Sequence, residues 1–316
     1  MKGLRLRDVV VGYGHGSSRL VAVDGVDLDV PEGQLVGLVG ESGSGKSSLA
    51  RAIVGLVNPL GGTIELDGRP LSSHGERKRP HPVQIVFQDP DSSLDPRMTV
   101  RESLSEALEW RKLGRAGLRA EIGRLLELVQ LGSDTADRLP RALSGGQRQR
   151  VAIARALAAE PRVLVADEIT SALDVSVQGA ILNLIKQLQG ELGFSMLLIS
   201  HNLAVVRYVC DVTAVMYLGR IVEVAASEEL VRAPRHPYSR SLLGALPQLG
   251  TSARTEWLAL DAEAPDPKRP PAGCRFHPRC PVGPLASSDR QLCLAEDPQP
   301  GSEERPHRAA CHFALD

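Results

Sequence analysis

One segment limits what this chain can fold into more than any other. The stretch GESGSGKS, from Gly40 to Ser47, matches G-x-x-x-x-G-K-S/T at every defined position. It follows an apolar, strand-like run, LVGLV, and opens a helix-like run, SSLARAIVGL. Glycines permit a tight loop and let backbone N–H groups approach phosphate oxygens at a helix N-terminus, whose dipole favours anions. We therefore expect a strand, a phosphate-binding loop and a helix, in that order.

The loop also predicts roles for single side chains. Lys46 is expected to reach the β- and γ-phosphates of a nucleotide, and Ser47 to bind Mg²⁺ through its hydroxyl. A Gly/Ser-rich turn that matched by chance would not need the strand and the helix on its two sides. The residues of this segment expected to contact nucleotide are Gly40, Glu41, Ser42, Gly43, Ser44, Gly45, Lys46, Ser47 and Ser48.

A second segment supplies carboxylates. The run VLVADE places apolar residues directly before Asp167 and Glu168. A buried strand that ends in a carboxylate delivers it to the C-terminal edge of a sheet, where ligands bind in open α/β folds. Asp167 then suits the Mg²⁺ shell, and Glu168 is placed to orient or deprotonate an attacking water. Taken alone, two acids after a strand are equally typical of a solvated turn, so this prediction depends on the loop at Lys46.

Three regions of the chain differ in patterning. Residues 1–85 hold short β-type runs such as LVAVDGVDLDV and GTIELDG, and residues 90–160 show helical spacing in ESLSEALEW and AEIGRLLELVQL. From residue 163, strand-like and helix-like runs alternate, which predicts a parallel sheet covered by helices. After residue 235 the composition shifts to Pro, Arg and Gly, which indicates a small appended module.

Charge and apolar content argue against several classes. The 316 residues include 37 Lys and Arg against 38 Asp and Glu, so general attraction to nucleic acid is not expected. The first residues, MKGLRLRDVV, lack the apolar core of a secretory signal, and no apolar run approaches the ~18 residues that span a bilayer. We expect a cytosolic chain that reaches a membrane only as a peripheral partner of another chain.

A third motif, LSGGQRQR from Leu143 to Arg150, precedes the strand that ends at Asp167. Together with the phosphate loop it resembles the ATP-binding-cassette family over residues 1–235. By this resemblance Tyr13 stacks on adenine, Gln88 is the Q-loop glutamine, and His201 is the switch histidine. The other residues that the resemblance assigns to nucleotide binding are Ser144, Gly145, Gly146 and Gln147 of the signature and Asp174 of the D-loop.

The resemblance implies an α/β fold, a P-loop NTPase cassette with a RecA-like parallel-sheet core, an antiparallel β subdomain and a helical signature subdomain. It implies a nucleotide-binding domain over 1–235, with the helical part near 89–160, and a small Cys-containing extension over 236–316. The implied catalytic residues are Glu168, His201 and Gln88, and the implied Mg²⁺ ligands are Ser47, Gln88 and Asp167. In this family the signature faces the phosphate loop of a second subunit, so ATP joins a dimer and hydrolysis releases it.

One position departs from the family pattern. A proline usually follows the catalytic glutamate, and here Ile169 follows Glu168. Proline cannot donate a backbone hydrogen bond, so this change is expected to alter the turn that leads into the D-loop. No catalytic group is lost, and an active site is still expected.

Other segments resemble one group of cassette proteins. ITSALDVSVQ, RHPYSRSLL and the cysteine-bearing tail resemble the ATPase subunits of bacterial oligopeptide and dipeptide importers, whose relatives import nickel and opines. The resemblance implies a second ATPase subunit, identical or a sister chain, two transmembrane permease subunits, an extracytoplasmic binding protein, and a place at the cytoplasmic face of the membrane. The cassette does not touch the cargo, so peptide is favoured over nickel or opine by resemblance alone.

Four of the five cysteines lie in the last 43 residues, separated by 5, 12 and 17 residues: Cys274, Cys280, Cys293 and Cys311. In a reducing cytosol such a group indicates a metal site before disulfides. Some family members carry a 4Fe–4S cluster there, and four thiolates also suit zinc. The second gap is longer than is usual in the family, so an iron–sulfur cluster, zinc and no ligand all stay open.

Other residues bear on this site less directly. Cys293, after the lengthened gap, is the least certain of the four ligands. Three histidines could substitute for a missing thiolate: His277, His307 and His312. Cys210 stands apart and is expected to be a buried apolar residue on a helix.

Three further readings compete with an importer ATPase. A soluble cassette protein of translation or DNA repair usually carries two cassettes or a long coiled-coil insertion, and neither is visible. A half-site that binds ATP without hydrolysing it is disfavoured by the intact Glu168 and His201. Exporter cassettes are usually fused to membrane spans, and the sequence contains no candidate span.

Overall fold

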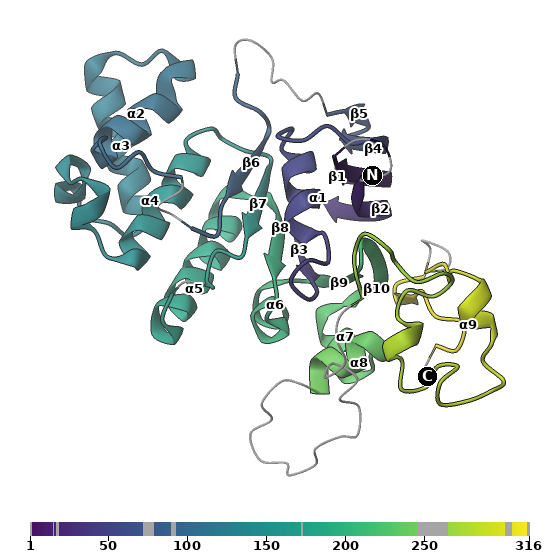
Figure 1. The fold of residues 1–316 in the computed structure, drawn as a ribbon. Helices are drawn as coiled ribbons and strands as arrows, with labels where there is room; N and C mark the ends of the chain where they lie inside the picture. The colour runs from purple at the N-terminus through teal and green to yellow at the C-terminus, as the bar shows by residue number, and fades with distance from the viewer. Residues whose placement is uncertain are drawn as a thin grey trace.

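The computed structural model describes residues 2–14, 16, 19–71, 79–89, 93–171, 173–244, 265–300 and 305–314. Two sheets and a group of helices make up this part of the chain (Figure 1). The larger sheet has seven strands in the order β11-β10-β9-β3-β8-β7-β6, and the smaller has four in the order β2-β1-β4-β5. The described architecture agrees with the predicted α/β class.

The strands of the larger sheet are β3 (Leu35–Val39), β6 (Val83–Val86), β7 (Val163–Asp167), β8 (Ser195–Ser200), β9 (Val212–Tyr217), β10 (Arg220–Ala226) and β11 (Arg308–Ala309). Strands β9, β3, β8, β7 and β6 run parallel, as the alternating strand and helix patterns predict, whereas β10 and β11 pair antiparallel at one edge. The antiparallel smaller sheet is formed by β1 (Gly3–Tyr13), β2 (Leu20–Pro31), β4 (Gly61–Leu66) and β5 (Arg69–Pro70).

The α-helices are α1 (Lys46–Ile53), α2 (Val100–Leu108), α3 (Arg115–Leu128), α4 (Gly145–Leu157), α5 (Val175–Leu192), α6 (Leu203–Val209), α7 (Ser227–Arg232), α8 (Pro237–Gly244) and α9 (Leu292–Ala295). Figure 1 shows α2, α3 and α4 gathered at the end of the molecule opposite the C-terminal residues. Two of these helices begin with a reciprocal cap, Thr99 with Glu102 for α2 and Ser144 with Gln147 for α4. Of the helices in the described part of the chain, none is long and apolar enough to cross a membrane.

The central parallel strands β3, β7 and β8 bury both of their faces. Along β3, Leu35 and Val39 belong to one core with the helices of the signature region, while Val36 and Leu38 belong to a second core with α1 and the smaller sheet. Strands β7 and β8 divide their side chains between the same two cores. Successive strand residues point to opposite faces, so a strand covered on both sides must be apolar throughout, as LVGLV and VLVA are.

Cys210 is buried, as expected, but it does not lie on a helix. It follows the last residue of α6 in an extended conformation, and its sulfur lies next to Gly37 of β3. Burial raises the pKa of its thiol, so the side chain stays protonated and acts as a small apolar group.

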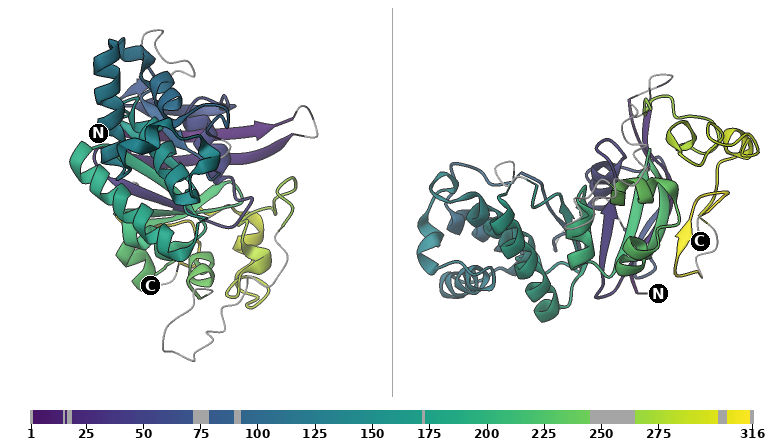
Figure 2. Two further views of the ribbon diagram at one scale, coloured as in Figure 1. Left: turned by 90° about the vertical axis from the view of Figure 1, so that its left-hand side faces the viewer. Right: turned by 90° about the horizontal axis from the view of Figure 1, so that it is seen from below.

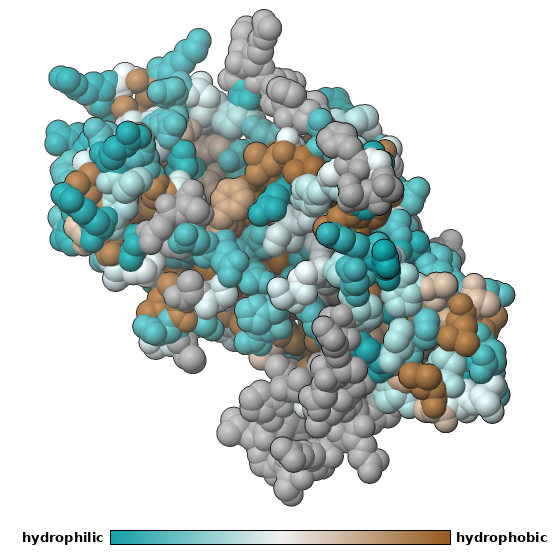
Figure 3. Space-filling model, viewed as in Figure 1, coloured by the Kyte–Doolittle hydropathy of each residue, from teal (hydrophilic) through white to brown (hydrophobic). Residues whose placement is uncertain are grey.

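The C-terminal residues are joined to the larger sheet by a short strand. After α8 the chain returns to the larger sheet, and β11 pairs with β10 through Ala309 and Glu223. The two perpendicular views in Figure 2 also place this segment beside the larger sheet. The region still exposes three leucines, Leu285, Leu292 and Leu294, and apolar side chains are visible on its surface at the lower right of Figure 3.

A buried carboxylate joins this segment to the larger sheet. Glu223 on β10 is 0% exposed and accepts hydrogen bonds from the backbone N–H groups of Arg235 (2.7 Å) and His236 (2.9 Å). Its Oε1 also lies 2.7 Å from His307 Nε2, and the other ring nitrogen of His307 lies 3.0 Å from Glu229. Glu223 therefore holds the chain at two places, directly before α8 begins and where the chain returns as β11.

The segment His236-Pro237-Tyr238 has a structural role at this junction. Burial lowers the pKa of His236 to about 3, so the ring is neutral, and its Nδ1 accepts a hydrogen bond from the Tyr238 N–H at 3.0 Å. The bond fixes the first turn of α8, which carries the Tyr238 ring into the core.

We expect Glu223→Ala to lower the free energy of unfolding by about 3 kcal/mol, because two backbone N–H groups and His307 lose a buried charged partner. Glu229→Ala is the matched control. This substitution removes the other carboxylate beside His307. Because the Glu229 side chain is 37% exposed, its loss should lower the free energy of unfolding by less than about 1 kcal/mol. Urea denaturation of the two variants and the parent measures the difference. Equal losses would show that Glu223 is not the anchor.

Candidate functional site

The phosphate-binding loop joins β3 to α1, as its motif predicts, and close packing explains its glycines. A Cβ on Gly40 would lie 2.2 Å from the Met216 carbonyl oxygen, and one on Gly45 would lie 2.2 Å from the carbonyl oxygen of Ala22. Gly45 also has a φ of 106°, in the left-handed region that side chains disfavour. The loop is thus held between the ends of β9 and β2 at a distance that only glycine permits.

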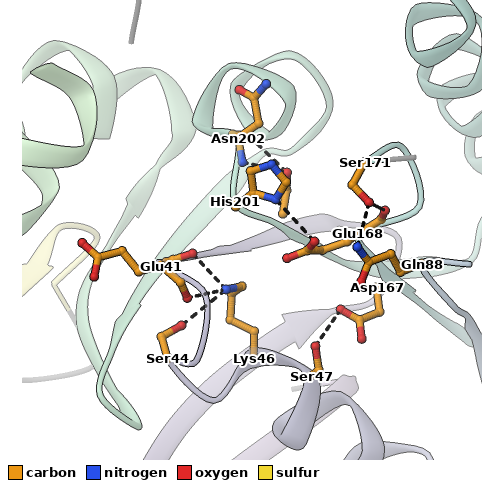
Figure 4. A network of polar contacts seen from close by, with 12 residues as sticks. Glu41, Ser44, Lys46, Ser47, Gln88, Asp167, Glu168, Ser171, His201 and Asn202 are labelled. Atoms are coloured by element: carbon orange, nitrogen blue, oxygen red, sulfur yellow. Dashed lines mark hydrogen bonds and ion pairs between the residues drawn. The ribbon is translucent and has the colours of Figure 1, made fainter. Parts of the chain in front are cut away.

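Lys46, the first residue of α1, folds back over the loop (Figure 4). Its Nζ donates to the carbonyl oxygens of Gly40 (2.9 Å) and Glu41 (2.8 Å), and the residue is only 4% exposed. Burial lowers the pKa of Lys46, while the nearby carboxylates of Glu168, Asp167 and Glu41 act in the opposite direction. A partly desolvated ammonium in a ring of backbone groups is well placed to meet phosphate oxygens.

Ser47 and Asp167 meet as the sequence predicts. The Ser47 hydroxyl donates to Asp167 Oδ1 at 3.2 Å, across the gap between α1 and the end of β7. Burial raises the pKa of Asp167, and the neighbouring Glu168 adds to that effect. A hydroxyl and a carboxylate side by side are the hard oxygen ligands that Mg²⁺ prefers, and a cation there would favour the ionised carboxylate. The pair therefore fits a magnesium ion.

Glu168 and His201 come together from neighbouring strand ends. Glu168 follows β7 with a φ of 48°, and its N–H donates to the Ile199 carbonyl of β8 at 3.0 Å. Its carboxylate lies 3.3 Å from His201 Nδ1, with the two side chains 18% and 58% exposed. Figure 4 shows both side chains on the same side of the sheet end as Lys46. The arrangement leaves a carboxylate open to water beside the phosphate loop.

Gln88 reaches this group through the D-loop. Its Nε2 donates to Ser171 Oγ at 3.1 Å, and Ser171 Oγ donates to the Glu168 carbonyl at 2.9 Å. Ala172 of the D-loop lies outside the described residues, and Asp174 is exposed at the start of α5. The assignment of Gln88 to Mg²⁺ stays a prediction, because its amide is bonded to Ser171 here.

Ile169, the residue where the resemblance led us to expect proline, is buried in the core that also contains residues of α4. The turn that follows it closes through its own backbone bonds, from Ser171 N–H to the Glu168 carbonyl (3.0 Å) and from Leu173 N–H to the Thr170 carbonyl (3.2 Å). A buried isoleucine thus gains apolar contacts where proline would supply only a restricted φ.

The signature residues and Tyr13 lie on other elements than the group around Lys46, at the start of α4 and at the end of β1. Ser144 is exposed and its hydroxyl accepts from the Gln147 N–H at 3.3 Å, which caps α4. A Cβ on Gly146 would lie 2.7 Å from Val177 of α5, so close helix packing already explains one signature glycine. Tyr13 is half-buried at the end of β1 against the second core. Its expected contact with adenine stays a prediction.

The four tail cysteines converge. Cys274, Cys280, Cys293 and Cys311 all line one small cavity, with His277 and His312 at its wall. Burial raises the pKa of Cys274 to about 12 and that of Cys280 to about 11, and the neighbouring cysteines add to the effect. His307, in contrast, is engaged by Glu223 and Glu229, so it is not available as a substitute ligand.

The cysteine cavity fits some ligands better than others. Within the described ranges, no group of three or more His, Cys, Asp or Glu side chains is placed to hold a single metal ion. Zinc needs four sulfurs at about 2.3 Å from one point, so a preformed zinc site is not supported. The four cysteines line one cavity without converging on a single point.

Two residues at the site were not expected from the sequence. Arg279 donates two hydrogen bonds to the Glu41 carboxylate, and the Tyr238 hydroxyl accepts one from the Glu41 N–H. Arg279 is 238 residues away from Glu41 in the chain, and Tyr238 is 197 residues away. No local sequence pattern signals contacts over such separations.

Comparisons with known proteins agree with these observations. The model of the ABC transporter family matches residues 23–171, and the model described as the oligopeptide/dipeptide transporter C-terminal region matches residues 222–284. The chain is 47% identical, over 88% of its length and 89% of the relative, to a Brucella ovis protein whose name assigns it to peptide import. It is 41% identical to the oligopeptide transport ATP-binding protein AppF of Bacillus subtilis, over 92% of the chain and 89% of the relative.

Two solved structures are similar as well. The first is cbiO1 from Clostridium perfringens, part of the ABC transporter complex cbiONQ, with a TM-score of 0.65 and 28% identity over 73% of this chain and 91% of that chain. The second is the ATP-binding cassette MJ0796 in a dimeric post-hydrolysis state bound to ADP and Pi, with a TM-score of 0.63 and 28% identity over 71% of this chain and 98% of that chain. The motifs, the site geometry and these likenesses agree that the chain belongs to the ABC transporter ATPases, among the ATP-binding proteins of oligopeptide and dipeptide transport.

Proposed function

We propose that this chain hydrolyses ATP to drive a membrane importer of oligopeptides or dipeptides. The observation that carries the proposal is the meeting of two pairs, Ser47 with Asp167 and Glu168 with His201, at the strand ends beside Lys46. Nickel and opine import remain alternative cargoes. The names of the relatives favour peptide, since they refer to peptide import and oligopeptide transport.

In the proposed reaction each residue has one task. Lys46 turns from the carbonyl oxygens of Gly40 and Glu41 to the β- and γ-phosphates. Ser47 and Asp167, with Gln88, would hold Mg²⁺, and the ion would supply positive charge beside the phosphate oxygens. The Glu168 carboxylate orients the attacking water and accepts its proton, and His201 steadies that carboxylate from 3.3 Å.

The proposed assembly needs a second cassette. Ser144, Gly145, Gly146 and Gln147 lie at the start of α4, a helix of 13 residues whose N-terminus favours anions. The hydrogen bonds that the Ser144 hydroxyl and N–H make in this chain are local, which supports a role toward a partner's nucleotide. Two permease subunits would anchor the pair at the cytoplasmic face of the membrane, and a binding protein outside the cytoplasm would deliver the cargo.

We propose two parts for the chain, a nucleotide-binding domain over 1–235 and a C-terminal extension over 236–316. The helical subdomain of the first part would cover about 89–160, with Tyr13 at the adenine. The extension would hold a 4Fe–4S cluster between Cys274, Cys280, Cys293 and Cys311, because the four side chains line one cavity. Zinc is the second choice, since the described residues do not converge on one ion.

We expect Glu168→Gln to lower ATP turnover by about 100-fold or more, because an amide cannot accept the proton of water. ATP binding should persist, because Lys46 and Ser47 are untouched. The control is Glu191→Gln, at an exposed glutamate near the C-terminal end of α5. It should leave turnover within about two-fold of the parent's. Turnover of purified protein is the measurement. If Glu168→Gln keeps a turnover near the parent's, Glu168 is not the group that accepts the proton of water.

The same Glu168→Gln chain should form a dimer when MgATP is added and stay monomeric with MgADP, because unhydrolysed ATP bridges the loop of one subunit and the signature of the other. Light scattering measures the mass in each state. Lys46→Ala serves as the control, since it should not bind the nucleotide that joins the subunits. A monomer under all conditions would contradict the homodimer and point to a sister subunit as the partner.

We expect protein purified without oxygen to contain about four irons per chain and to absorb in the visible range. Cys280→Ser should reduce the iron content strongly, whereas Cys210→Ser, at a buried cysteine beside Gly37, should not. Elemental analysis of the three proteins decides between the candidates. About one zinc per chain would replace the cluster by a structural ion, and the absence of both metals would reject a metal site.

A further inference from the structure

Glu41, the second residue of the phosphate-binding loop, is held at three points. Its carbonyl oxygen accepts from Lys46 Nζ at 2.8 Å, within the loop. Its N–H donates to the Tyr238 hydroxyl at 2.9 Å, and its carboxylate accepts two bonds from Arg279 at 3.0 and 3.2 Å. Two of the three partners therefore come from the C-terminal extension rather than from the nucleotide-binding residues.

Arg279 is built into its place. Its side chain is 3% exposed, and it lies on the 3-10 turn His277–Arg279, between Cys274 and Cys280. The guanidinium donates to the Tyr217 hydroxyl at 3.4 Å and lies 6.0 Å from the centre of that ring. A planar guanidinium matches a carboxylate with two parallel bonds, so this pair fixes the direction as well as the position of the Glu41 side chain.

Tyr238 is equally constrained. Its ring is fully buried and packs on Tyr217 and Phe276, with centroids 4.6 and 5.4 Å away. Burial raises the pKa of the phenol, so the hydroxyl stays protonated. The three rings belong to the core that also contains β3 and the signature helices. Packing of the ring therefore fixes the position of the hydroxyl that accepts the hydrogen bond from the Glu41 N–H.

The contacts on Glu41 bear on ATP binding in two ways. Because Lys46 Nζ lies on the carbonyl oxygens of Gly40 and Glu41, the position of the Glu41 backbone sets where the ammonium waits for phosphate. The carboxylate of Glu41 would also repel the phosphates if it were unpaired, and Arg279 neutralises it at hydrogen-bond distance. Loss of Arg279 would leave a loop less ordered and more negative.

We propose that Arg279 and Tyr238 of the C-terminal extension are positioning residues for the phosphate-binding loop, so that ATP affinity depends on the docked extension. The proposal rests on the proposed function, because it takes the loop at Lys46 as the nucleotide site. Arg279 and Tyr238 act through Glu41 and touch neither the nucleotide nor the magnesium. They tie the ATP site to the cysteine-lined region that directly flanks Arg279.

The test uses the full chain and MgADP as the probe, with dissociation constants from calorimetry. Arg279→Gln should weaken MgADP binding by about 5- to 50-fold, since a buried charge partner of Glu41 is lost. Arg279→Lys should recover part of the loss, as it restores the charge without the two parallel bonds. Tyr238→Phe removes only the hydroxyl and should weaken binding by a smaller factor, about 2- to 5-fold.

Two comparisons separate positioning from general docking. Asp297→Asn breaks the 2.7 Å ion pair with Arg220, which also joins the extension to the cassette but does not touch the loop. It should leave the affinity for MgADP within about two-fold. In the background of Glu41→Gln, Arg279→Gln should have less than about a two-fold effect, because the carboxylate that it neutralises is gone.

Each outcome decides something. The proposal is overturned if Arg279→Gln and Tyr238→Phe both bind MgADP like the parent, or if Asp297→Asn weakens binding as much as Arg279→Gln does. If Arg279→Gln fails to fold, two measurements still test the proposal. One is MgADP binding by Tyr238→Phe, and the other is the effect of Arg279→Lys with and without Glu41→Gln. Lys46→Ala distinguishes the two levels of inference. Parent-like binding by Lys46→Ala rejects the nucleotide site itself, whereas lost binding there with unchanged Arg279→Gln rejects only the positioning role.

Discussion

The parallel register of β3, β8 and β7 is the constraint on which the rest of this site depends. Val39 pairs with Ser200 and Ile199 pairs with Asp167, so the three strands end at the same level. Lys46 follows the first strand after the loop, His201 follows the second, and Asp167 ends the third. Parallel strands place their carboxyl ends at one edge of a sheet, and here that edge brings together Lys46, the two carboxylates and His201.

Holding this edge requires polar groups in places that water does not reach freely. Lys46, Asp167, Glu223 and Arg279 are all buried, and each has a hydrogen-bond partner: backbone groups for Lys46 and Glu223, the Ser47 hydroxyl for Asp167, and the Glu41 carboxylate for Arg279. Burying a charge is expensive unless it is paired and hydrogen-bonded, so every one of these contacts also specifies a single arrangement of its neighbours. Glu223 secures the C-terminal extension, and Arg279 connects that extension to the phosphate loop.

The sequence predicted some elements well for identifiable reasons. The run VLVAD is apolar at every position before its acid, and it became β7, buried on both faces. The strand, loop and helix around Lys46 were predicted in the right order, and close contacts under 3 Å require glycine at two loop positions, Gly40 and Gly45. Other expectations failed at boundaries. Cys210 follows α6 rather than lying on it, and β11 joins the main sheet although only Arg308 and Ala309 form it, too short a run to show a strand period.

What the sequence determined by itself was a set of local motifs and their order along the chain: the loop GESGSGKS, the segment LSGGQ, a strand that ends in Asp167 and is followed by Glu168, and His201 after the next strand. Each of these is a local pattern, because backbone geometry at a turn or a strand end limits the residue types within a few positions. Only the tertiary structure decided which distant groups meet. The contacts of Glu41 with Tyr238 and Arg279, of His307 with Glu223, and of the four tail cysteines with one cavity join segments with no shared periodicity. Such contacts follow from how the layers pack, and packing is a property of the whole chain.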